Sequence, residues 1–156
     1  MPKLTILAAC ERVIIEREAS LPSLISIFQR MNVQIQDAPL PDNALSPTRW
    51  AVFTLWQHTP EERGVAYTQR TEIISPSGEK FAEVTTPLKI TEADDLQSKN
   101  HLDVFGIPIN VEGFIKVRVW LEGVADATGE YQFLVKHVPK AKQESPAPAE
   151  ALQTQS

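Results

Sequence analysis

A chain of 156 residues with 42% hydrophobic and 22% charged residues fits one globular domain, which needs neither a metal nor a disulfide to fold. The formal net charge of −5 argues against nucleic acid and anionic lipid as partners, because both require a basic surface. No apolar stretch approaches the roughly 20 residues that cross a bilayer. The single cysteine, Cys10, excludes an internal disulfide and favours a reducing cytoplasm.

The N-terminal residues 4–10 alternate as a strand whose two sides are both small or apolar, which predicts a position inside a sheet. A second apolar run, Val13–Ile15, is compatible with either a tight hairpin or a bent continuation of this strand. Leu7–Cys10 is similar to a lipoprotein lipobox, but the apolar run before Cys10 is too short for a signal segment. We therefore expect Cys10 to be a buried strand cysteine.

Residues 21–36 are compatible with two structures. Apolar residues follow a candidate N-cap, Ser20, at helical spacing, which is typical of an amphipathic helix. Alternating β-branched residues between Ile25 and Ile35 favour strand instead, as do the strands predicted on both sides. A proline-rich loop is expected over residues 39–47.

The middle of the chain contains the clearest strand, residues 49–58. Residues 65–74 and 81–90 are expected to pair as a hairpin, because Ser75–Gly78 has proline second and glycine fourth, as in a type I turn. Residues 91–100 are predicted to form a loop or a single helical turn. The segment 102–109 contains Gly106 and Pro108, which suits a strand end, an edge or a bulge.

The last two predicted strands, residues 114–121 and 131–136, alternate clearly and are expected to pair antiparallel. From Pro139 onward the chain lacks aromatic residues, and Leu152 is the single large apolar residue. Such a segment buries too little surface to offset its ordering entropy. The sequence therefore predicts a domain over residues 1–138 and a disordered tail over residues 139–156.

Short strands and turn signals, with no amphipathic helix between most of them, predict an all-β fold. We expect an antiparallel β-sandwich, immunoglobulin-like or related, of about eight strands. A parallel α/β fold is excluded, because its strands need long helical crossovers.

Catalytic and cofactor motifs are missing from the sequence. It contains no phosphate-binding loop, dinucleotide fingerprint or nucleophile elbow, and one cysteine cannot build a thiolate zinc cluster. His58, His101 and His137 are far apart in the chain, and the acidic loop around Asp94 and Asp95 supplies too few oxygens for calcium. No catalytic residue, metal ligand or cofactor is predicted.

Aromatic side chains suggest a binding surface. If Ala51, Phe53 and Leu55 face the core, strand alternation places Trp50 and Trp56 on the opposite side. Outward tryptophans could anchor a protein partner or stack a sugar ring, unless a loop or a second sheet covers them. The same argument applies to the strand 114–121. The candidate partner or ligand face comprises Trp50, Trp56, Phe114, Arg118 and Trp120.

Four segments carry a resemblance to known proteins: Leu4–Cys10 with Val13–Ile15, Leu24–Phe28, Ile73–Gly78 and Val111–Val117. Their order resembles an uncharacterised family of small bacterial proteins. The resemblance implies a β-sandwich without an established activity, favours strand at residues 24–28, and supplies no catalytic residue. The tryptophan-rich strand 49–56 and the longer segment 91–101 depart from the family's pattern.

Two functional hypotheses follow, in addition to an enzyme with an unrecognised site. The first is a cytoplasmic, non-enzymatic domain that binds another protein or a second copy of itself. The alternative is a carbohydrate-binding module that uses Trp50, Trp56 or Trp120 as a platform. Exposure of these rings discriminates between the two hypotheses, because a broad apolar patch indicates a protein interface.

Overall fold

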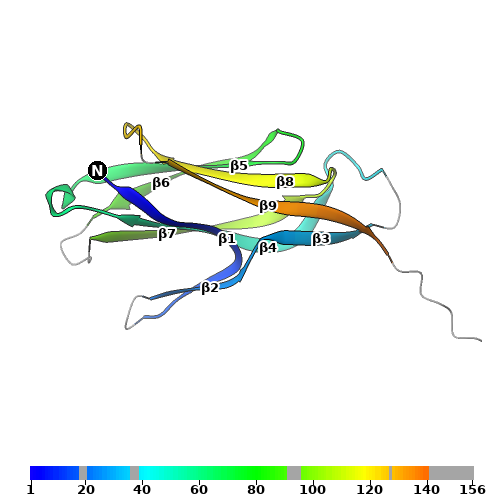
Figure 1. The fold of residues 1–156 in the computed structure, drawn as a ribbon, viewed down its shortest axis with the longest axis horizontal. Helices are drawn as coiled ribbons and strands as arrows, with labels where there is room; N and C mark the ends of the chain where they lie inside the picture. Colours follow the sequence, from blue (N-terminus) through cyan, green and yellow to red (C-terminus); the bar gives the residue numbers. More distant parts are fainter. Residues whose placement is uncertain (18–20, 36–38, 91–95, 127, 141–156) are drawn as a thin grey trace, which may run out of the picture.

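The computed structural model describes residues 1–17, 21–35, 39–90, 96–126 and 128–140. Within these residues nine strands form two sheets that pack together (Figure 1), so the predicted all-β sandwich is confirmed. Except for Pro139 and Lys140, the predicted tail lies outside the described residues. The elements are β1 (Lys3–Ile15), β2 (Pro22–Ile27), β3 (Arg30–Ile35), β4 (Leu45–Gln57), the 3-10 turn η1 (Pro60–Glu62), β5 (Ala66–Ile74), β6 (Lys80–Lys89), β7 (Gln97–Pro108), β8 (Gly113–Leu121) and β9 (Thr128–Pro139).

The four-stranded sheet has the order β2-β1-β4-β7. β1 lies inside this sheet, as predicted, and is long enough to serve two partners. Its first half pairs antiparallel with β4 as far as Cys10, which lies opposite Ala51. Its second half pairs with β2, from Cys10 to Ile15. Val13–Ile15 is therefore a continuation of the first strand, and it forms a hairpin with β2.

The five-stranded sheet has the order β3-β9-β8-β5-β6. Both predicted hairpins are confirmed: β5 pairs antiparallel with β6, and β8 with β9. The turn between β5 and β6 is closed by a hydrogen bond from the Gly78 amide to the Ser75 carbonyl, 2.9 Å long. β3 joins the sheet parallel to β9, which differs from every other strand pair of the described residues.

The ambiguous segment 21–36 forms strands, so the strand alternative is confirmed for the residues that the structure describes. The chain crosses from one sheet to the other between β2 and β3. At the crossing, the Phe28 amide donates to Ala9 of β1, and the Leu134 amide of β9 donates to the Gln29 carbonyl. A helix in this segment would have removed one strand, β2 or β3, from each of the two sheets.

An aromatic cluster forms the centre of the sandwich. The rings of Trp50 and Phe133 meet edge to face with centroids 5.5 Å apart, and Phe28 packs against both. Aliphatic residues from both sheets, among them Ile73 and Val117, complete this cluster. Such aromatic contacts add to the stabilisation that burial alone provides.

The outer face of the four-stranded sheet is also largely buried. Ala51 and Phe53 are no more than 1% exposed, although they face away from the five-stranded sheet. In Figure 1 the hairpin of β2 and the end of β1 lies on this side, below β1, β4 and β7. Arg12 borders a hollow with residues of β4 and β7, and Ile15 borders another with the ends of β6 and β7. The hairpin therefore covers part of this face.

Candidate interaction surface

Trp50 and Trp56 lie in the core, so the prediction that they form an outward face is wrong. They are 1% and 0% exposed. The Trp50 indole donates to the Gly106 carbonyl (3.0 Å) and the Trp56 indole to the Gln69 side chain (2.7 Å). The prediction assumed that β4 has one buried face. In the structure the second sheet covers the tryptophan face, and the other face is buried as well.

Phe114, Arg118 and Trp120 do lie on the outward face of β8. Phe114 is 47% exposed, and Trp120 is partly buried. The two rings are six positions apart along the strand, which corresponds to about 20 Å. Arg118 lies between them and pairs with Glu130 of β9 at 2.6 Å. These residues therefore share a face but do not form one aromatic platform.

Ion pairs occupy much of this outward face of the five-stranded sheet. Lys80 contacts Glu72 at 3.1 Å and Glu83 at 2.6 Å, and Arg70 pairs with both Glu83 and Glu122. The hydrogen bond from Arg118 lowers the pKa of Glu130. Because these charges satisfy one another within the chain, the face offers few unpaired groups to a ligand.

The three histidines do not assemble a site. His58 is buried and hydrogen-bonds the Ser98 hydroxyl at 3.0 Å, whereas His101 is exposed on β7. The His137 ring hydrogen-bonds the Ile109 carbonyl at 2.6 Å. Within the described ranges, no group of three or more histidine, cysteine or acidic residues could hold a metal ion. Cys10 is buried, as expected, and burial raises the pKa of its thiol.

The hairpin of β1 and β2 carries a concentration of exposed apolar residues. We call it the hairpin surface and define it as Ile14, Ile15, Leu21, Ile25 and Ile27, which are between 36% and 58% exposed. The register of the hairpin places Ile14, Ile25 and Ile27 on one side of it and Ile15 on the other. Large aliphatic side chains gathered in this way mark an interaction site more often than scattered ones do.

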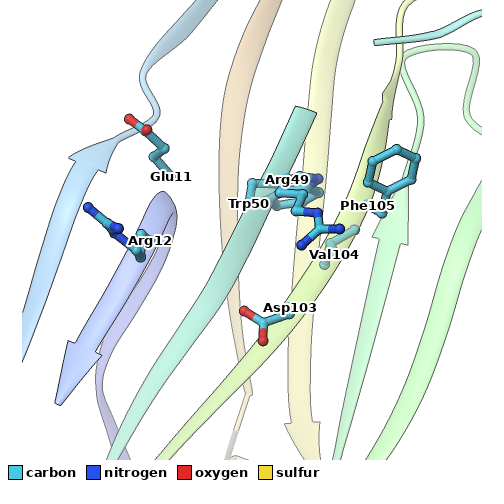
Figure 2. Close-up of a pocket in the computed structure, with 7 residues that line it drawn as sticks. All are labelled: Glu11, Arg12, Arg49, Trp50, Asp103, Val104 and Phe105. Atoms are coloured by element: carbon cyan, nitrogen blue, oxygen red, sulfur yellow. The ribbon is translucent and has the colours of Figure 1, made fainter. Parts of the chain in front are cut away.

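A hollow of about 420 Å³ lies at the base of the hairpin. Figure 2 shows Glu11 and Arg12 of β1 on one side and Arg49, Asp103 and Phe105 of β4 and β7 on the other. Phe105 is 63% exposed, and no ion pair joins the two arginines to the two carboxylates in the described part of the chain. The hollow thus combines an exposed ring with charges that are available to a partner.

Sequence reasoning missed the hairpin surface. The signal was present, because Val13–Ile15 and the alternating Ile25 and Ile27 are apolar runs in a short segment between charged residues. Their exposure could not be inferred, since an apolar strand is normally assigned to the core. Their exposure follows from the divergence of β1 from β4 after Cys10, and no sequence pattern predicts where this divergence occurs.

A comparison with known protein families and with curated proteins finds no match for this chain. In the residues that the structure describes, no helix is long and apolar enough to span a membrane.

Proposed function

We propose that this protein is a non-enzymatic interaction domain that binds another protein chain through the hairpin surface. The observation that carries the proposal is the exposure of five large aliphatic side chains on one two-stranded hairpin. Burying the exposed part of such a side chain against a partner is favourable, by about 25 cal/mol per Å² of apolar surface removed from water. A group of exposed aliphatic side chains flanked by charged residues is typical of an interaction site.

The carbohydrate alternative loses most of its support. Two of its three platform residues, Trp50 and Trp56, are packed between the sheets. The third, Trp120, borders a hollow of about 310 Å³ with Arg118 and Glu130, but these two charges already pair with each other. Sugar rings are recognised by exposed aromatic faces, whereas the hairpin surface is aliphatic.

A cytoplasmic location and membership of the bacterial family that the sequence resembles are part of the same proposal. A reducing compartment suits the single buried thiol, Cys10. The net charge of −5 favours a protein partner over nucleic acid or anionic lipid.

Photo-crosslinking in the native host tests the proposal. A photoreactive phenylalanine analogue replaces Ile25 in one variant and Thr85, an exposed residue of β6, in a control variant. We expect protein adducts from position 25 at several times the yield from position 85, with unchanged thermal unfolding in both variants. Equal yields from the two positions would show that the hairpin surface is not the interface.

A further inference from the structure

The second half of β1 has a backbone edge that no strand of the described residues covers. Pairing with β4 ends at Cys10, and β2 occupies the other side of residues 12–15. The Glu16 amide donates to the Leu21 carbonyl, 3.0 Å away, on the β2 side of the hairpin. Because backbone groups of successive strand residues point to opposite sides, those of Val13 and Ile15 point to the free edge.

The sequence of this edge is complementary to itself. Residues 11–17, which comprise the end of β1 and the two residues after it, read Glu-Arg-Val-Ile-Ile-Glu-Arg, so an acid and a base stand at each end of an aliphatic centre. When two copies lie antiparallel with Ile14 opposite Ile14, Glu11 meets Arg17 and Arg12 meets Glu16 of the other copy. All four charged side chains are exposed, and none has an ion-pair partner among the described residues.

The hydrogen-bonding pattern is compatible with the same register and excludes a slip of one residue. Antiparallel strands alternate hydrogen-bonded and non-hydrogen-bonded residue pairs. Opposing Ile14 with Ile14 places Val13 of one copy opposite Ile15 of the other, and both direct their backbone groups to the free edge. After a slip of one residue, Val13 and Ile15 would lie opposite residues of the other copy whose backbone groups point towards β2 and are not available. Charge pairing and backbone pairing therefore agree on one arrangement.

This edge is accessible and contains no proline. Ile14 and Ile15 are 43% and 42% exposed, and Ile15 borders the hollow at the ends of β6 and β7, at the rim of the sandwich. Proline commonly blocks pairing at sheet edges. The edge strands β2, β6 and β7 contain Pro22, Pro87 and Pro108, respectively, whereas residues 11–17, like the edge strand β3, contain none.

We infer that the partner of this hairpin is a second copy of this chain, which binds at the free edge of β1. The two chains pair antiparallel through residues 11–17 about a two-fold axis at Ile14, which joins two hairpins into a four-stranded sheet. The interface is isologous, as in most homodimers. This inference rests on the proposed function and gives it a specific partner.

Charge reversal tests the register by sedimentation velocity over a range of protein concentrations. Glu11→Arg places like charges opposite each other at two symmetric sites, so we expect the dissociation constant of the dimer to rise about tenfold or more at low salt. Adding Arg17→Glu to this variant should restore wild-type dimerisation, because the pair is then reversed. Glu79→Arg, the same charge change in the exposed turn before β6, should have no effect.

A disulfide tests the position of the axis. Non-hydrogen-bonded antiparallel pairs have Cα atoms about 4.5 Å apart, within the range that disulfides bridge. Ile14→Cys should therefore form a covalent dimer under mild oxidation, whereas Ile25→Cys, away from the axis, should not. Cys10 is 0% exposed, so the wild-type chain serves as a second control.

A wild-type chain that is monomeric at all concentrations overturns the inference. A dimer that is insensitive to Glu11→Arg, or an Ile14→Cys variant that crosslinks no faster than Ile25→Cys, overturns it as well. If the chain is monomeric but photo-crosslinks from position 25 to a different protein, the inference fails and the proposed function stands. If position 25 gives no adduct above its control and the chain is monomeric, both fail.

Discussion

At the scale of single residues, a buried glutamine explains how the tryptophan-rich strand can bury Trp56 in the core. Gln69 of β5 is 2% exposed, and its side-chain oxygen accepts hydrogen bonds from Thr54 (2.9 Å) and Trp56 (2.7 Å) of β4. Its side-chain nitrogen donates to the Thr71 hydroxyl at 3.0 Å. The amide thereby satisfies polar groups from both sheets, and Trp56 can be buried without leaving its indole N–H unpaired.

Replacing Gln69 should therefore destabilise the sandwich more than its volume suggests. Gln69→Leu keeps an apolar side chain of similar size but leaves the Trp56 and Thr54 donors without their acceptor. We expect the free energy of unfolding to fall by about 2–4 kcal/mol, since each unsatisfied buried group costs roughly 1–3 kcal/mol. Denaturant unfolding followed by tryptophan fluorescence measures the change.

The matched control is Gln132→Leu, at an exposed position of β9. This substitution removes no buried hydrogen bond, so it should change the free energy of unfolding by no more than about 0.5 kcal/mol. Equal losses in the two variants would mean that the hydrogen bonds of Gln69 contribute little to stability.

At the scale of elements, sequence periodicity predicted the hairpins and missed the placement of the tryptophans. The turn Ser75–Gly78 and the alternation in β8 and β9 depend on neighbouring residues, so they could be read locally. Which faces of β4 are covered depends on β5, β8 and β9, whose residues follow it in the sequence, and on the hairpin of β1 and β2. Outward-facing side chains were therefore predicted correctly only on β8, where one sheet face is solvated, at Phe114, Arg118 and Trp120.

An unusual backbone conformation in β2 lies close to the residues of β1 at which pairing with β4 ends. Ser26 has a positive φ of 53°, uncommon for a residue with a side chain, and the regular pairing of β2 with β1 is interrupted there. We expect Ser26→Gly to be at least as stable as the wild type, because glycine adopts this conformation without strain. Thermal unfolding monitored by circular dichroism is a suitable measurement.

Ser23→Gly, in the same strand, is the control for this prediction. Ser23 is not among the residues with positive φ, so glycine brings only its entropic cost of roughly 0.5–1 kcal/mol. The strained backbone at Ser26 would be contradicted if both variants lost the same stability.

At the scale of the whole molecule, the two sheets contact each other closely along one side, where β1 of one sheet approaches β9 of the other. Gly129 of β9 lies against Leu4 and Leu7 of β1, and a Cβ atom at this position would overlap the Leu4 side chain. Leu4 in turn packs on the core cluster that contains Trp56 and Leu121. A side chain at residue 129 would therefore displace the end of the Leu4 side chain from its present position.

A double-mutant cycle tests this contact between the sheets. Gly129→Ala should lower the free energy of unfolding by about 1–2 kcal/mol, because the Leu4 side chain must move from its packed position. Leu4→Ala loses buried surface but creates the space that the methyl group added at position 129 needs. The double variant should therefore be more stable than the sum of the single losses predicts, by roughly 1 kcal/mol. Ile107→Ala, in the other core cluster, should combine additively with Gly129→Ala. Strict additivity of the Leu4 and Gly129 changes would mean that the two sheets do not meet at this pair.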